Sequence, residues 1–242
     1  MDTPEFDWSA PGIAPSVASE VWGVLDQLKL AKSEDDAIDA TYALHELICY
    51  AAVTVEEVTV PAVAALYEML AVENFAWRNF VLQILDTVVS VDGVLGSSTP
   101  LKSRVLRSVL AGTSLVQGLE SSSSRDVRGA AILLLANLSR RPAEDFNRFS
   151  QACASDQDPV VQADLALAAT VCIRRADGAI GESAAARWAE YALTHTNPAV
   201  RFRVGQELAD HGFPAGGIDA GAVVDEAQPL VLSRRLFRVE YI

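Results

Sequence analysis

Histidine and cysteine are the residue types in this 242-residue chain best suited to metal or nucleophilic chemistry, and there are three of each. His45-Glu46 is the only His-Glu dipeptide, whereas a site for two metal ions needs several such pairs. His195 shortly precedes Asn197 at the end of a predicted helix, where a cationic or polar group suits the helix dipole. His211-Gly212 is typical of a helix exit with a glycine cap. We therefore expect structural histidines, no metal site and no cofactor.

The cysteines, Cys49, Cys153 and Cys172, are far apart and lie in apolar helical sequence. Their odd number and the absence of a CxxC pair argue against a disulfide framework or a zinc site. Buried structural thiols are the expectation. The sequence also lacks the motifs of serine hydrolases, zinc proteases, phosphate loops and dinucleotide folds. These observations favour a protein that is not an enzyme.

Charge is distributed unevenly along the chain. Acids outnumber bases 32 to 19, for a net charge of −13. Residues 1–100 contain 16 acids and three bases, whereas residues 101–242 contain 16 of each. This balance argues against general nucleic-acid binding and against docking on an anionic membrane. An acidic surface attracts cationic proteins, although it also serves general solubility.

Aromatic residues among carboxylates mark a candidate binding surface in the acidic half. Such sets are typical of hot spots for basic proteins, with Tyr and Trp as anchors and charges that steer the encounter. The predicted partner-binding residues are Glu56, Glu57, Tyr67, Glu68, Glu73, Trp77, Arg78 and Asp92. Charge reversal of Glu56, Glu57 and Glu68 together is expected to slow association at least about tenfold at low salt.

The elements that position these residues are predicted from internal repetition. Three segments align without gaps, with Val127, Val161 and Val200 in corresponding places, 34 and 39 residues apart. Asp158 and Asn197 are good N-caps, and each is followed by proline at the first helical position. Apolar residues then recur at helical spacing and predict a buried stripe. The predicted core residues are Val127, Leu134, Leu135, Val161, Leu165, Val200, Val204 and Leu208.

A second helix is predicted after each of these, at Glu144–Ala154, at Glu182–Thr194 and, more weakly, between Ala220 and Leu232. Gly216-Gly217 and Pro229 interrupt the last pattern, so residues 213–242 are expected to be irregular. Earlier units are predicted at Ala37–Cys49, Pro61–Leu70 and Phe75–Leu82. A loop or lid is expected at residues 89–100, then extra helices at Leu101–Leu110 and up to Leu119. Only Val53–Val60 shows strand-like alternation.

The chain resembles the HEAT-repeat family of α-solenoids. The residues that carry the resemblance open three helices: Asp126-Val127-Arg128, Asp158-Pro159-Val160-Val161 and Asn197-Pro198-Ala199-Val200-Arg201. The resemblance implies an all-α, right-handed solenoid of about five helix pairs, each stabilised by its neighbour. The predicted organisation is an N-terminal arm and first helix (1–32), repeats (33–212, with an insertion at 89–112) and the C-terminal segment (213–242).

A narrower similarity covers Val53 to Leu70, which looks like a segment of actinobacterial HEAT-like proteins of unassigned function. In those proteins a His-Gln-Gly-Thr-Val-Tyr stretch leads into an Ala-Val-Pro-Phe-Leu helix. Here Ala51-Ala52-Val53 stands in place of His-Gln-Gly, and Glu56 in place of Tyr.

Two functions are compatible with this reading. The first is a non-enzymatic scaffold that binds a basic protein, such as a bacterial immunity protein that neutralises a cationic toxin. The alternative is an enzyme resembling the HEAT-like alkylpurine DNA glycosylases, with Trp77, Trp188 and Asp164 as candidate residues; it requires a basic groove. Secretory-signal features are missing from the N-terminal residues, and the most apolar stretch, Ala130–Leu138, is too short to span a bilayer, so a cytoplasmic location is expected.

Overall fold

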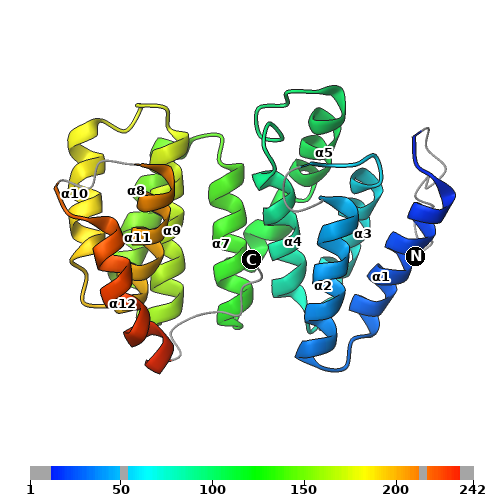
Figure 1. The fold of residues 1–242 in the computed structure, drawn as a ribbon, viewed down its shortest axis with the longest axis horizontal. Helices are drawn as coiled ribbons and strands as arrows, with labels where there is room; N and C mark the ends of the chain where they lie inside the picture. Colours follow the sequence, from blue (N-terminus) through cyan, green and yellow to red (C-terminus); the bar gives the residue numbers. More distant parts are fainter. Residues whose placement is uncertain (1–11, 50–53, 213–216, 235–242) are drawn as a thin grey trace. The chain divides into compact units, whose positions relative to one another are not determined.

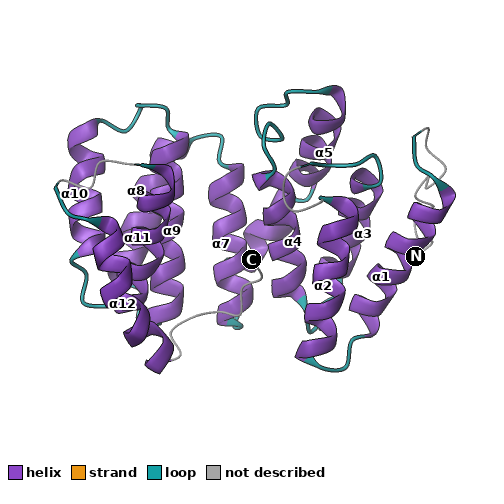
Figure 2. Cartoon of the chain, viewed as in Figure 1, coloured by secondary structure: helices purple, strands orange, loops and turns teal. Residues whose placement is uncertain are grey.

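The computed structural model describes residues 12–49, 54–212 and 217–234, and within these ranges it contains twelve helices and no strand (Figures 1 and 2). The all-α prediction is therefore confirmed. The strand-like pattern near Val53–Val60 does not form a strand in its described part, because Thr59 and Val60 already belong to a helix. The chain divides into two compact units, residues 1–118 with 241–242 (unit 1) and residues 119–240 (unit 2).

Unit 1 contains helices whose starts follow local capping chemistry. Ser33 forms a capping box with Asp36 at the start of one helix. At the start of another, the Thr99 hydroxyl accepts a hydrogen bond from the Lys102 amide, and Pro100 occupies the first helical position. The helices are α1 (Pro15–Leu30), α2 (Glu34–Ile48), α3 (Thr59–Ala71), α4 (Arg78–Ser90) and α5 (Pro100–Ala111), followed by α6 (Thr113–Leu119), which ends at the unit border.

The core of unit 1 lies where these helices meet. Helix α1 packs on α2 and α3, α2 packs on α4, and α3 packs on both α4 and α5 (Figure 1). Fully buried side chains come from four of them: Leu28, Leu44, Leu66, Phe80 and Leu85. Each helix therefore buries one apolar stripe against its neighbours, as amphipathic helices in a layered all-α fold do.

The connection after α4 also packs onto unit 1. Val91 and Val94 are buried, and the Lys102 ammonium donates to the Asp92 carbonyl oxygen. Residues 91–99 are therefore fixed to the unit by two apolar side chains and a hydrogen bond, which does not support the expectation of a lid. The extra helices predicted after this connection are present as α5 and α6.

Unit 2 contains the three helices on which the repeat prediction rests. The side chains of Ser124, Asp158 and Asn197 accept hydrogen bonds from backbone amides at the first turns of α7 (Arg125–Leu138), α9 (Pro159–Arg175) and α11 (Pro198–His211). The intervening helices are α8 (Pro142–Ser155), α10 (Glu182–Leu193) and α12 (Ala220–Arg234). All eight predicted core residues are buried.

Helix α9 is central to unit 2, since it packs against α7, α8, α10 and α11. A polar contact links two corresponding helix starts. The Asn197 amide nitrogen donates to the carbonyl oxygen of Pro159 at 2.8 Å and to the Gln162 side-chain oxygen at 2.9 Å. The Asn197 side chain thus caps α11 and also joins it to the start of α9.

The prediction of an irregular segment at residues 213–242 is wrong over α12. This helix contains Pro229, buries Ala227 and Val231, and packs along α11. Gly205 of α11 permits the close approach, because a Cβ there would lie 2.7 Å from Val224 Cγ2. Apolar burial therefore outweighs the backbone hydrogen bond that Pro229 cannot make. Residues 213–216 and 235–242 lie outside the described residues.

Candidate functional site

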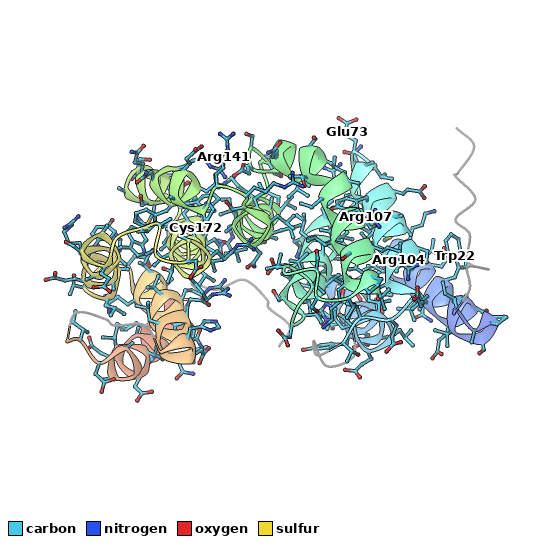
Figure 3. The ribbon with its side chains drawn as sticks, turned by 90° about the horizontal axis from the view of Figure 1, so that it is seen from above. Trp22, Glu73, Arg104, Arg107, Arg141 and Cys172 are labelled. Carbon is cyan, nitrogen blue, oxygen red and sulfur yellow. The ribbon has the colours of Figure 1, made fainter. Side chains whose placement is uncertain are left out.

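The predicted acidic residues differ in their exposure and in their partners. Glu56 has an exposed side chain at the approach to α3. Glu57 forms an ion pair with Arg104 of α5, with an oxygen 2.7 Å from the Arg104 Nη2 atom. Asp92 is exposed beyond α4. Glu73 is exposed past the end of α3, where Figure 3 shows its side chain extending outward. Glu57 therefore differs from the others, because a cation already faces it.

Tyr67 contributes to packing and is not presented as an exposed anchor. Its hydroxyl donates to the carbonyl oxygen of Val109 at 2.7 Å, and burial raises the pKa of the phenol. A Cβ at Gly112 would overlap the Tyr67 ring. Tyr67 thus fastens α3 to the end of α5, and its hydroxyl is already engaged inside the fold. The helix pattern places it off the apolar stripe of α3, but α5 covers that face.

Trp77 and Arg78 order the connection between α3 and α4. The Trp77 indole N–H donates to the carbonyl oxygen of Ala31 at 3.1 Å, and its ring lies 6.0 Å from that of Phe80. The Arg78 guanidinium donates to the carbonyl oxygen of Val72 at 2.6 Å. Both side chains therefore fix backbone segments in place. Trp77 also lines a groove.

This groove has a volume of about 850 Å³ and is formed within unit 1 by α1, α3 and the connection that follows α3. Its apolar walls come from Trp22, Leu25, Met69, Val72, Phe75 and Trp77. Its charged lining residues are Asp26, Lys29 and Glu68. Of the eight predicted site residues, Glu68 and Trp77 line this groove, and the other six do not.

The sequence interpretation missed the contribution of α1. Trp22, Asp26 and Lys29 are spaced i, i+4 and i+7, and so share one face of that helix. Trp22 also lies outside the buried stripe of Val21, Leu25 and Leu28, and its side chain is 45% exposed. A large aromatic residue off the apolar stripe was the available signal. The sequence prediction places a first helix within residues 1–32 but names none of its residues as a partner contact.

The three cysteines and His45 are placed in surroundings that suit structural roles. All three cysteines are buried, and burial raises the pKa of each thiol to about 12. Burial lowers the pKa of His45 to about 4 and leaves its Nε2 atom without a hydrogen-bond partner. The thiols therefore stay protonated and His45 stays neutral near pH 7, which fits the structural roles expected for them.

The residues considered for a glycosylase site serve other purposes. Asp164 is buried on α9 with a carboxylate oxygen 3.5 Å from the Arg203 guanidinium. The Trp188 indole donates to the Thr170 hydroxyl at 3.0 Å and stacks edge-on against Phe146. Thr170 follows Asp164 by six positions, which is about 120° around the helix. Trp188 therefore contacts a different face of α9 from the face that carries Asp164.

Three arginines at the ends of α7 and α9, Arg141, Arg174 and Arg175, each contact a protein group. Arg174 lies 2.9 Å from Glu207, and Arg175 donates to the carbonyl oxygen of Ser139. Arg141 pairs with Glu144 on the surface (Figure 3). These three cations are therefore engaged within the protein at the helix ends.

Neither a metal centre nor a membrane span is found in the described part of the chain. Residues 12–49, 54–212 and 217–234 contain no group of three or more His, Cys, Asp or Glu side chains arranged to hold a metal ion. Within the same ranges, every helix is too short or too polar to cross a bilayer.

No family model, curated protein or solved structure matches this chain. The geometry of unit 1 is therefore the basis for a functional proposal.

Proposed function

We propose that this chain is a non-enzymatic protein-binding scaffold whose acidic N-terminal unit engages a basic protein partner. The specific form we propose is an immunity protein that neutralises a cationic toxin in a bacterial cytoplasm. The observation that carries the proposal is charge. Unit 1 contains 16 acidic and six basic residues, whereas unit 2 contains 16 and 13.

The position of these acids supports a role in recognition. The exposed acidic side chains of unit 1 include Glu20, Asp26, Glu34, Asp35, Asp39, Glu46, Glu56, Glu73 and Asp92. Three of the six bases, Lys102, Arg104 and Arg107, lie on α5, and Arg104 is paired with Glu57. A surface with this excess of carboxylates produces a field that accelerates encounter with cationic proteins.

We further propose that the helices form about five HEAT-like pairs of a right-handed solenoid. The first helices of these pairs are α2, α4, α7, α9 and α11, and packing within a pair supports the proposal for α4 with α5, α9 with α10 and α11 with α12. In unit 2, α9 packs on both α7 and α11, the helices that occupy the corresponding place in the neighbouring pairs. A shared hydrogen bond from Asn197 to Pro159 joins two such helices. Stacked repeats present extended surfaces suited to binding other macromolecules.

The alternative, an enzyme of the alkylpurine DNA glycosylase type, requires a basic groove and an available carboxylate. The groove of unit 1 contains two acids and one base, and the buried carboxylate of Asp164 has Arg203 as its counter-charge. A phosphate backbone would be repelled by the net charge of unit 1. These features favour the binding of a protein over the binding of DNA.

The experiment compares two charge-reversed variants of the full chain. In the first, Glu56, Glu57 and Glu68 of unit 1 become lysine; in the matched control, the exposed Glu190, Asp210 and Asp225 of unit 2 become lysine. Proteins captured by the wild-type chain are identified, purified and assayed for direct binding. We expect a basic partner whose association slows at least about tenfold at low salt with the first variant only.

Two results would contradict the proposal. One is a partner whose association is slowed by the unit 2 control and not by the unit 1 variant. The other is binding of short duplex DNA in a gel-shift assay at low ionic strength, with an affinity that falls steeply as salt is added. That result would favour the nucleic-acid enzyme. Because lysine at position 57 would face Arg104, a further variant that keeps Glu57 and reverses Glu56, Glu68 and Glu73 separates charge from local disruption.

A further inference from the structure

We infer that the groove of unit 1 receives an amphipathic, basic helix of the partner protein, with its apolar face inside and its lysines or arginines near Asp26 and Glu68. This inference rests on the proposed function and specifies where and how the partner is held. It depends on three properties of the groove: exposed apolar walls, an ordered frame and an excess of negative charge.

The apolar walls are more exposed than ordinary core side chains. Val72 is 54% exposed and Trp22 45% exposed, whereas Leu25 and Met69 beneath them are buried. Contiguous exposed apolar surface on a folded protein commonly marks an interaction site. Trp22 and Trp77 are the residue type most enriched among binding hot spots, and Phe75 adds a third aromatic ring.

The frame of the groove is held in place before any ligand arrives. The Trp77 indole is fixed to the Ala31 carbonyl oxygen at the end of α1, and Arg78 is fixed to the Val72 carbonyl oxygen at the end of α3. These two hydrogen bonds hold the connection between α3 and α4 against the ends of α1 and α3. A wall that is already ordered loses less conformational entropy on binding.

The spacing of the lining residues suits a helix as the occupant. On α1 the lining residues Trp22, Leu25, Asp26 and Lys29 follow i, i+3, i+4 and i+7, and on α3 Ala65, Glu68 and Met69 follow i, i+3 and i+4, with Val72 directly after the helix. The two helices pack against each other, so the groove follows a pair of helical faces. An amphipathic helix that lays its apolar face into such a groove is a common mode of peptide recognition.

Charge decides which amphipathic helix fits. Asp26 and Glu68 line the groove against the single cation Lys29, and the exposed Glu73 follows Val72. The whole of unit 1 carries a formal charge of −10, from 16 acids and six bases. A helix with acidic flanks would meet repulsion here, whereas a basic one finds counter-charges at the groove and attraction from the whole unit.

The test uses synthetic helices as probes and the full chain as receptor. The probe is a leucine–lysine peptide of about 14 residues, which is about 21 Å long as a helix. One comparison peptide has the same composition in scrambled order, and another replaces lysine by glutamate. Indole N–H signals in ¹⁵N NMR spectra report the site. We expect the basic amphipathic peptide to shift the Trp22 and Trp77 signals and to leave that of Trp188, which is buried in unit 2, unchanged.

Matched variants separate groove contacts from general charge. Val72→Lys places a cation in the groove, and Leu232→Lys makes the same change at an exposed leucine of unit 2. The pair Asp26→Asn with Glu68→Gln removes two groove charges, and Asp39→Asn with Glu46→Gln removes two exposed charges from α2. We expect each groove variant to weaken peptide binding at least about tenfold, and each control to change it less than about threefold.

Several outcomes would overturn the inference. Equal binding of the scrambled or glutamate peptide would show that amphipathic or charge matching is not what the groove selects. Equal loss in the control variants would show that only net charge matters. Sedimentation that reveals a dimer of the wild-type chain, abolished by Val72→Lys, would make a second copy the occupant.

The groove and the proposed function can fail separately. A captured basic partner that binds Val72→Lys as well as wild type leaves the function standing and refutes the groove as its site. If the peptides behave as expected but captured partners ignore the unit 1 charge reversal, the groove stands and the proposed function fails.

Discussion

At the scale of single residues, several polar side chains of this protein hold helices in place. Asn197, Tyr67 and Trp77 each donate a hydrogen bond to a backbone carbonyl oxygen in another part of the fold. Loss of such a hydrogen bond destabilises a fold by about 0.5–1.5 kcal/mol, and by more where a buried group keeps no other partner. The same residue types could have served catalysis or binding, so their partners decide their role.

The Asn197 side chain provides a residue-scale prediction, because it caps α11 and also binds Pro159. Asn197→Ala should destabilise the region of α9 and α11 by about 2 kcal/mol or more, since both a cap and a carbonyl partner are lost. Ser124→Ala, at the cap of α7, should cost about 1 kcal/mol or less, because the exposed Ser124 makes one long capping bond of 3.5 Å. Hydrogen-exchange mass spectrometry of these helices measures the destabilisation by each variant. Equal effects of the two variants would refute a role for the contact between Asn197 and Pro159.

His45 predicts a pH dependence of stability in unit 1. Its folded-state pKa of about 4 lies below the ordinary histidine pKa of 6.5, because burial disfavours the imidazolium. The unfolded chain therefore binds more protons between these values, and stability falls as the pH falls through this range. From about pH 7 to about pH 5 the loss should be about 2 kcal/mol.

The measurement is denaturant unfolding over this pH range in wild type and His45→Gln. The variant should show a flatter pH dependence, whatever its absolute stability, because carboxylates contribute equally to both proteins. Parallel pH profiles would contradict the assignment.

At the scale of elements, glycines report how closely helices approach. Gly205→Ala places a methyl group 2.7 Å from Val224 Cγ2 and 3.3 Å from the Ala220 carbonyl oxygen, where α12 crosses α11. Overpacking of this kind costs about 1–3 kcal/mol. Gly23→Ala in α1 meets no atom within 4 Å and should stabilise the protein by about 0.5–1 kcal/mol through helix propensity. Thermal unfolding of both variants checks the opposite signs, and a stabilising Gly205→Ala would mean that α12 does not pack there.

At the scale of the whole molecule, the two units differ in net charge while each contains 16 acidic residues. A short oligolysine peptide can be coupled to carboxylates by carbodiimide. At low salt, unit 1 should therefore carry at least about three times as many adducts as unit 2. Raising the ionic strength from about 50 mM to about 300 mM should remove most of this preference, because screening shortens the range of the field. Peptide mapping by mass spectrometry locates the adducts. An even distribution at low salt would show that the charge asymmetry does not steer cationic ligands.

The sequence by itself determined the helical class, the starts of α9 and α11, the buried stripes of unit 2 and the acidic first half. These features depend on neighbours along the chain: a capping residue, a proline at the first helical position and apolar residues one turn apart. Even the helix at residues 220–234 was visible as a weak pattern. Pro229 argued against it, and only burial against α11 overrides that local penalty.

Only the tertiary structure decided which candidate residues share a site. Glu57 meets Arg104 across 47 positions and Tyr67 meets Val109 across 42, so two predicted contacts for a partner are used inside the fold. Conversely, Trp22 of α1 lines the same groove as Met69 of α3 and Val72 directly after it, although nothing in either segment specifies the other. Helical periodicity defines the face on which a side chain lies. Which helix covers that face depends on how the whole set of apolar stripes is buried together.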